Sequence, residues 1–179
     1  MERGAASVLE DHPGRVGPAP RGVVAGGSLW VDFFVPIEPQ AKGRPRAQLR
    51  RGKDSKPYIH WHTPQDTSDY EDAVGTVALR ELRAIDIDGP GDFTLPIQER
   101  RILAIVDFYL PKPKSYPKSV VHHVKRPDLD NLVKAIFDSL QKHRVIEEDS
   151  HVTQLWTSKR YADLEHPAGT RIQLTCLPL

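Results

Sequence analysis

The chain has 179 residues, of which 39% are hydrophobic and 27% are charged, and its formal net charge is +1. This length and this balance fit one folded domain with its own core, and they exclude a wholly disordered chain. The near-neutral total does not by itself mark a nucleic-acid-binding protein, so the local distribution of charge must decide that question.

Residues 1–28 are rich in Gly, Pro, Ala and Arg and have little periodicity, so we interpret them as a flexible N-terminal tail before a single domain over residues 29–179. The tail lacks the apolar segment of a signal peptide, and no apolar run approaches the length of a membrane span. The single Cys176 rules out an intramolecular disulfide. We therefore expect a cytoplasmic protein with no membrane contact.

A basic stretch follows the first predicted strand, the aromatic and β-branched run at residues 30–35. Residues 39–62 contain one acid, Asp54, and aromatic residues such as Tyr58 and Trp61 at their end. We predict a long basic loop that contacts a phosphate backbone and unstacked bases. The alternative is a solvated loop whose aromatic residues pack into the core. The candidate DNA-binding residues of this loop are Lys42, Arg44, Arg46, Arg50 and Arg51.

The middle of the chain alternates a helix and a strand. Apolar residues recur at helical spacing over residues 67–84, and a Gly/Pro-rich connector follows at 86–96. Residues 101–110 predict a central buried strand. The next segment, 111–126, has several cations, three prolines and no acid, so it reads as a stiff basic connector or as a solvated linker. Its candidate DNA-binding residues are Lys114, Lys118, Lys125 and Arg126.

An amphipathic helix is predicted next, with Leu132, Ile136 and Leu140 on one face. Pro127 marks its boundary, because proline cannot sit deep in a helix. Asp128 is a suitable N-cap residue, at the end where the helix dipole favours negative charge.

The opposite, polar face of this helix has Asp130, Lys134 and Asp138 at intervals of four residues. These residues admit a purely structural interpretation, in which Asp128 caps the helix and Lys134 pairs with Asp130 or Asp138. The chemical interpretation depends on a second acidic group further along the chain.

That second group is Glu147, Glu148 and Asp149, which precede a predicted strand over residues 152–161. A helix, a short turn and a returning strand are expected to bring Asp149 beside Asp128 and Asp130. Converging carboxylates repel one another unless a cation bridges them, and Mg²⁺ prefers such oxygen ligands together with substrate phosphate oxygens. The predicted site therefore binds Mg²⁺, with Mn²⁺ as a substitute.

A last strand is predicted at residues 170–176. The expected order is strand, helix, strand, helix, strand, strand. This order predicts a small α+β (mixed α/β) domain, with a mixed sheet of about four strands packed against two main helices.

Two segments together resemble the RusA family of Holliday junction resolvases. They are the run Arg126-Pro127-Asp128-Leu129-Asp130-Asn131-Leu132-Val133-Lys134-Ala135 and the run Glu148-Asp149-Ser150-His151-Val152. The upstream run Pro39-Gln40-Ala41-Lys42-Gly43-Arg44-Pro45-Arg46 also resembles this family's early basic loop. The similarity covers residues 29–177. The family consists of phage and prophage endodeoxyribonucleases.

The resemblance implies that Asp128, Asp130 and Asp149 hold the catalytic metal and that Lys134 is an essential lysine. Glu148 is a further candidate ligand. The implied function is Mg²⁺-dependent resolution of four-way junctions by paired phosphodiester hydrolysis, performed by a homodimer in DNA recombination and repair. Two alternatives stay open: a structure-selective protein that binds branched DNA without turnover, and a nuclease that acts on other branched DNA.

Overall fold

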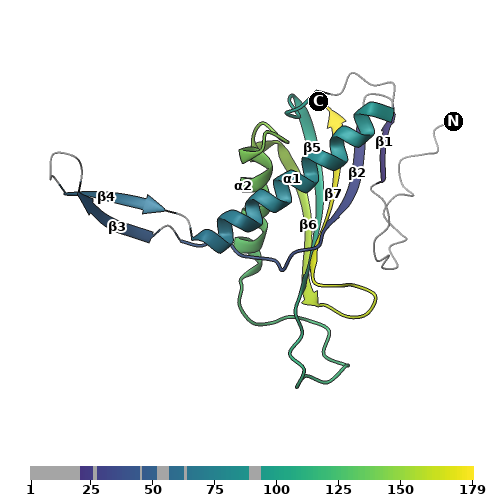
Figure 1. Cartoon of the computed structure of the whole chain (residues 1–179). Helices are drawn as coiled ribbons and strands as arrows, with labels where there is room; N and C mark the ends of the chain where they lie inside the picture. The colour runs from purple at the N-terminus through teal and green to yellow at the C-terminus, as the bar shows by residue number, and fades with distance from the viewer. Residues whose placement is uncertain (1–20, 26–27, 45, 52–56, 63, 89–93) are drawn as a thin grey trace.

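A computed structural model describes residues 21–25, 28–44, 46–51, 57–62, 64–88 and 94–179. The main body is a five-stranded sheet with two helices on one face (Figure 1). In spatial order its strands are β1 (Arg21–Ala25), β2 (Ser28–Val35), β7 (Gly169–Pro178), β5 (Arg100–Leu110) and β6 (Val152–Tyr161). The helices are α1 (Gln65–Asp88) and α2 (Leu129–Lys142), and a short 3₁₀ helix, η1 (Asp149–His151), precedes β6.

Strands β5 and β6 run parallel, whereas the other neighbouring pairs of this sheet are antiparallel. A parallel pair needs a crossover connection, and α2 supplies it. The predicted α+β class and the predicted order of elements are confirmed, with β1 as an additional edge strand. Neither helix, within the described residues, is both long and apolar enough to cross a membrane.

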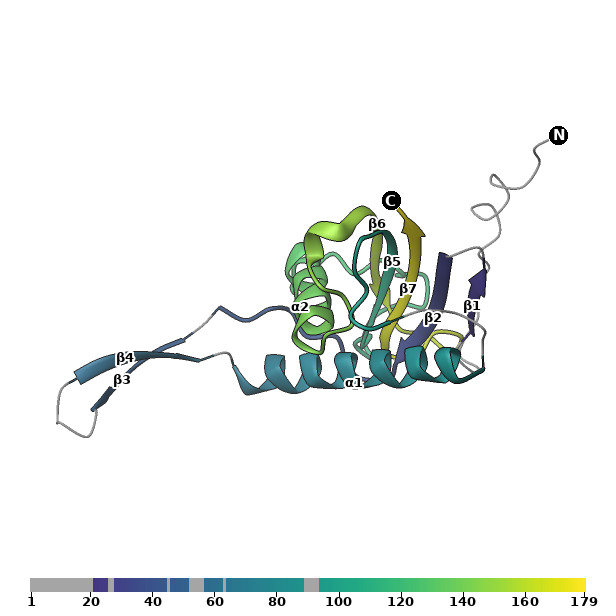
Figure 2. The same cartoon turned by 90° about the horizontal axis from the view of Figure 1, so that it is seen from above.

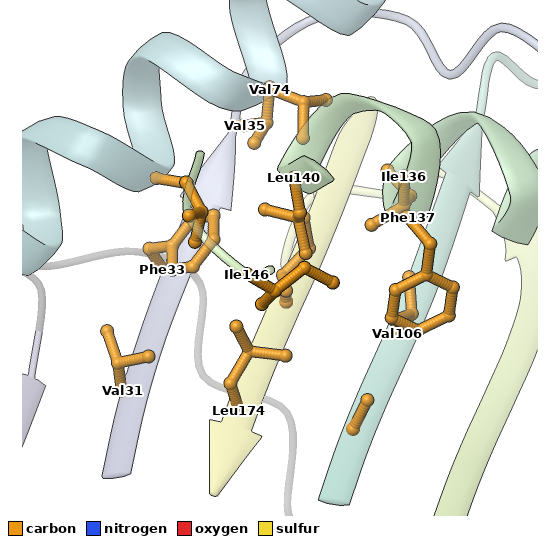
Figure 3. Packing of buried hydrophobic residues seen from close by; sticks show 14 of the residues in the cluster. Val31, Phe33, Val35, Val74, Val106, Ile136, Phe137, Leu140, Ile146 and Leu174 are labelled. Carbon is orange, nitrogen blue, oxygen red and sulfur yellow. The ribbon is translucent and has the colours of Figure 1, made fainter. Parts of the chain in front are cut away.

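The core lies between the sheet and the two helices. Alternate residues of β2, including Val31, Phe33 and Val35, are buried, as the period of two along a strand requires. Figure 3 shows these side chains packed with Leu140 of α2 and Val74 of α1. Both helices therefore bury their apolar faces against the same side of the sheet.

Two segments differ from the sequence predictions. Residues 46–51 and 57–62, predicted as parts of a loop, form the strands β3 (Arg46–Arg51) and β4 (Pro57–His62) of a hairpin. Figures 1 and 2 show this hairpin extending away from the main body. Residues 21–25, assigned to the tail, form β1 through antiparallel pairing with β2. The remainder of the tail, residues 1–20, lies outside the described residues.

Smaller differences concern boundaries. Helix α1 continues to residue 88 and so includes the start of the segment predicted as a connector. The predicted strand over residues 152–161 is confirmed as β6, but the acids before it lie in and before η1, a short helix that the sequence did not predict. The unpredicted strands form because they are hydrogen-bonded to other strands, which local sequence does not reveal. Helix α1 is longer than predicted because it continues past its apolar positions.

Candidate active site

Two aspartates stand at the N-terminal end of α2. Asp128 is the N-cap residue, with an extended backbone (φ −75°, ψ 143°), and its side chain makes no capping hydrogen bond. Asp130 lies in the first helical turn, and both side chains are exposed. We call this pair the acidic corner. Its carboxylates lie where the helix dipole stabilises negative charge, and the capping role that would explain Asp128 structurally is absent.

Among the described residues, Asp128, Asp130, Glu148 and Asp149 have no cationic partner, and Lys134 has no acidic partner. Six other acids in the described chain form ion pairs. These are Asp32 with Arg171, Glu71 and Asp138 with Lys42, Asp72 with Lys142, Glu81 with Arg80, and Asp163 with His166. The structural interpretation, in which Lys134 pairs with Asp130 or Asp138, is therefore not what the described residues show. These charges are available for binding.

Lys42 has a different role from that of a free surface cation. Its Nζ lies 2.6 Å from Oε1 of Glu71 in α1 and 2.8 Å from Oδ2 of Asp138 in α2. Burial would lower the pKa of Lys42, but hydrogen bonds to Asp138 and Glu71 outweigh that effect, so the pKa is raised. Its backbone N–H donates to the carbonyl oxygen of Asn131 at 2.9 Å. Lys42 thus attaches the 36–44 segment to both helices. Arg44, two residues further along this segment, is exposed.

The basic connector between β5 and α2 is held against the C-terminal end of β6. Here the N–H of Tyr161 donates to the carbonyl of Val121 at 2.8 Å. The Nζ of Lys159 donates to the carbonyl oxygens of Lys125 and Pro127, at 2.8 and 2.6 Å. Lys159 therefore anchors the backbone immediately before Asp128.

We call the exposed cations of this connector the basic rim: Lys114, Lys118, Lys125 and Arg126. The Nζ of Lys125 lies 5.1 Å from the centre of the Tyr116 ring. Sequence reasoning identified the rim but missed Lys159, whose signal was only a lysine in a predicted strand. Because Lys159 fixes the chain between the rim and the acidic corner, it positions the positive and negative parts of the site relative to each other.

Asp149 lies elsewhere in the chain. It begins η1, immediately before β6, and is exposed, as is Glu148, which accepts a hydrogen bond from Ser150 at 3.1 Å. Asp149 therefore follows the C-terminal end of α2, whereas the acidic corner is at the N-terminal end. A helix of 14 residues is about 20 Å long at 1.5 Å per residue.

The length of β6 also places Asp149 far from the acidic corner. Lys159 contacts the backbone at Pro127, and the seven-residue step from Val152 to Lys159 spans about 23 Å. The described residues accordingly contain no group of three or more acidic, His or Cys side chains that could hold a metal. The predicted convergence of Asp149 with Asp128 and Asp130 does not occur within one chain, because a strand that follows a helix starts at the helix's far end.

The remaining candidate DNA-binding residues lie on the hairpin. Arg50 and Arg51 of β3 are exposed, and Arg46 starts the same strand. Leu49 and Ile59 face each other in the register and are 72% and 60% exposed. The side chains of Arg46, Tyr58 and Trp61 are not among those described. The expected DNA contact of all three residues therefore stays a prediction. The hairpin joins the N-terminal end of α1 and places its cations outside the main body (Figure 2).

Comparisons with known proteins identify the family of the chain. The sequence profile described as endodeoxyribonuclease RusA matches residues 36–175, a span that includes the hairpin, the acidic corner, the basic rim and Asp149. A Bacillus subtilis (strain 168) protein, "Uncharacterized protein YqaN", is 29% identical over 133 residues, which cover 74% of this chain and 89% of that protein. The match extends over most of both proteins and is not limited to one motif. On this evidence, the chain belongs to the RusA endodeoxyribonuclease family.

Proposed function

We propose that the chain is a divalent-metal-dependent endonuclease that resolves four-way DNA junctions as a symmetric dimer in the cytoplasm of a bacterial or phage-infected cell. The observation that carries this proposal is the acidic corner itself. Two exposed carboxylates without a cationic partner among the described residues stand beside the basic rim, in a chain of an endodeoxyribonuclease family.

The donor set of the acidic corner fits a hard divalent cation. Mg²⁺ in phosphate-processing sites typically takes one or two carboxylates and completes its shell with waters and substrate oxygens. Asp128 and Asp130 would supply these carboxylates, with Asp149 as a third ligand and Glu148 as a further candidate. When bound there, the cation would reduce the negative charge at the scissile phosphate and lower the pKa of a water.

The chain's own residues would position the DNA. The cations of the basic rim and Arg44 would bind phosphates on either side of the scissile bond, which offsets the repulsion between DNA and the carboxylates. Lys134, four residues after Asp130 on α2 and exposed, would stabilise the charge that develops on the phosphoryl oxygens during hydrolysis. Lys159 would act as a positioning residue through the carbonyls of Lys125 and Pro127.

A junction has two-fold symmetry and requires two matched nicks, which a symmetric dimer delivers. The structure adds a second reason for a dimer. Since Asp149 lies about one helix length from the acidic corner of its own chain, a three-carboxylate site requires an Asp149 from another copy. The same observation favours one alternative function, a branched-DNA-binding protein without turnover, in which the acids never assemble.

A junction assay tests the proposal. Wild type and Asp130→Asn are incubated with a labelled four-way junction, with and without Mg²⁺, and analysed on denaturing gels for cuts and native gels for binding. We expect paired nicks only with wild type and Mg²⁺, and at least about a 100-fold loss of cleavage in Asp130→Asn. Binding should survive, because the substitution removes a negative charge that repels phosphate.

Asp66→Asn is the matched control, because Asp66 occupies the first turn of the other helix and is exposed. It removes the same charge from the same kind of position and should leave cleavage unchanged. Full cleavage by Asp130→Asn would refute the metal site. Binding by wild type without cleavage at any Mg²⁺ or Mn²⁺ concentration would favour the protein without turnover, and equal cleavage of flaps and junctions would favour a general branched-DNA nuclease.

A further inference from the structure

A pocket of about 480 Å³ lies at the C-terminal end of α2. It is bounded by the second half of α1, by residues 94 and 95 before β5, and by the turn that follows α2. Its volume falls within the range of pockets that bind small organic ligands. The acidic corner stands at the N-terminal end of the same helix, so this pocket is separate from the proposed nuclease site. We call it the arginine pocket, because Arg83 and Arg144 both line it.

The wall of the pocket that follows α2 is held in place by hydrogen bonds. The imidazole of His143 has Nδ1 3.0 Å from the carbonyl oxygen of Ser139 and Nε2 3.3 Å from Oδ1 of Asp72 in α1. Gly75 lets this ring lie directly against α1, because a Cβ at that position would lie 2.1 Å from the ring. The backbone N–H of Arg144 donates to a carbonyl oxygen in the last turn of α2 at 2.9 Å. The pocket is therefore preformed, and both ring nitrogens of His143 face acceptors within the chain.

The lining of the arginine pocket combines apolar side chains with two cations. Leu79, Leu82 and Leu95 supply the apolar part: Leu82 is buried, and the other two pack against the core. Arg83 and Arg144 are exposed, and neither has an acidic partner among the described residues. None of the described residues that line the pocket is acidic. The pocket therefore carries two positive charges that no described acid neutralises, beside an apolar surface.

This lining suits an apolar group that ends in a carboxylate. Guanidinium groups bind carboxylates through paired N–H donors, so Arg83 and Arg144 favour an anionic head. A lone anion such as phosphate would leave the leucines in contact with water, and a nucleic-acid backbone offers phosphates but no apolar side chain to cover them. The last residue of a peptide, with an aliphatic side chain and a free α-carboxylate, matches both parts of the lining.

We propose that the arginine pocket binds the C-terminal residue of a partner protein, with its α-carboxylate between Arg83 and Arg144 and its aliphatic side chain against the leucines. The two arginines belong to different elements, α1 and the turn after α2, so a ligand that contacts both would join these elements. This site goes beyond the proposed nuclease function and does not depend on it. It would attach the chain to another protein while the acidic corner stays free for DNA.

Fluorescence anisotropy of the full chain with labelled peptides tests the proposal. The probe is a short peptide that carries an N-terminal fluorophore and ends in leucine with a free carboxylate, and it is compared with the same peptide bearing a C-terminal amide. We expect saturable binding of the free acid and about tenfold weaker binding of the amide, because the amide cannot form the charged hydrogen bonds. Equal binding of both peptides, or binding of neither, would overturn the proposal. Binding of octanoate but of neither peptide would overturn the peptide as the ligand.

Substitution of the two arginines locates the binding. Arg83→Gln and Arg144→Gln each remove a guanidinium from an exposed position, so both variants should fold. Each should bind the free-acid peptide about tenfold more weakly and the amide as wild type does. Arg101→Gln is the matched control, because Arg101 is also exposed but does not line the pocket, and its affinity should be unchanged. Wild-type affinity in both pocket variants, with folding verified by circular dichroism, would contradict the site.

Protection of a thiol gives a second measurement that leaves both arginines in place. Thr94 is exposed and lines the pocket, so Thr94→Cys should react with a maleimide, and saturating free-acid peptide should slow that reaction. Leu164→Cys is the matched control, since Leu164 is fully exposed and lies outside the pocket, and the peptide should not protect it. The native Cys176 is buried and does not compete. Unchanged labelling of Thr94→Cys with the peptide bound would show that the peptide binds elsewhere and would overturn the proposal.

Discussion

Replacing Lys42 separates its structural role from DNA binding. The substitution Lys42→Met keeps most of the side-chain volume but removes the ammonium between Glu71 and Asp138. Breaking a buried ion pair costs about 3–5 kcal/mol. Glu71 is 6% exposed, but Lys42 and Asp138 are 22% and 26% exposed, so solvent screens part of the interaction. We therefore expect a loss of about 2–3 kcal/mol in the free energy of unfolding.

For a chain of this length, that loss corresponds to a fall in Tm of about 4–12 °C, measurable by circular dichroism. Lys134→Met is the matched control: the same substitution in an exposed lysine of α2, with an expected effect within about 0.5 kcal/mol. The two variants should behave oppositely in the junction assay. At a temperature where both are folded, Lys134→Met should lose cleavage, whereas Lys42→Met should retain most of it.

The pH dependence supplies an independent check. The folded-state pKa of Lys42 lies above its ordinary value of 10.5, so the stability that the ammonium contributes is fully present below pH 10.5. That contribution is lost as the pH rises through the folded-state pKa. The stability difference between wild type and Lys42→Met should accordingly stay constant at neutral pH and shrink at strongly alkaline pH. An unchanged Tm for Lys42→Met, together with lost DNA binding, would refute the structural role.

Three further predictions concern the core. Burial raises the pKa of the Cys176 thiol to about 12, so it should resist alkylation in the native protein at mildly alkaline pH and react on unfolding in urea, as mass spectrometry would show. Tyr70→Phe leaves the buried Thr170 hydroxyl without its 2.6 Å partner and should cost about 1–2 kcal/mol in urea titration; no change would mean that Thr170 finds another partner. Gly75→Ala places a Cβ about 2.1 Å from the His143 ring, and we expect the resulting strain, about 1–3 kcal/mol, to exceed the gain in helix propensity; a higher Tm would contradict this packing.

Periodicity predicted much of the fold. The apolar spacing of α2 and the alternation along β2 are local properties, and burial against one shared core turns them into structure. The β3–β4 hairpin was missed because its alternating residues are mixed with many cations and are stabilised by cross-strand pairing, which a single strand's sequence does not record. β1 was missed for the same reason: its conformation comes from hydrogen bonds to β2.

Only part of the candidate site could be predicted from the sequence. The positions of Asp128 and Asp130 followed from Pro127 and the start of an amphipathic pattern. The partners of Lys42 lie on two helices far along the chain. The sequence alone therefore does not show whether Lys42 binds DNA or forms an ion pair with these acids. The position of Asp149 depends on the direction of β6, and parallel pairing with β5 sets that direction.

The β3–β4 hairpin makes the fold modular. It extends away from the sheet and helices (Figures 1 and 2), and none of its residues with a described side chain belongs to the buried core. Changes in its length or composition should therefore leave the folding of the main body intact. Selection can then alter how far this cationic hairpin reaches without rebuilding the acidic corner at the start of α2. Grafting hairpins between relatives would accordingly test whether the hairpin contributes to substrate choice.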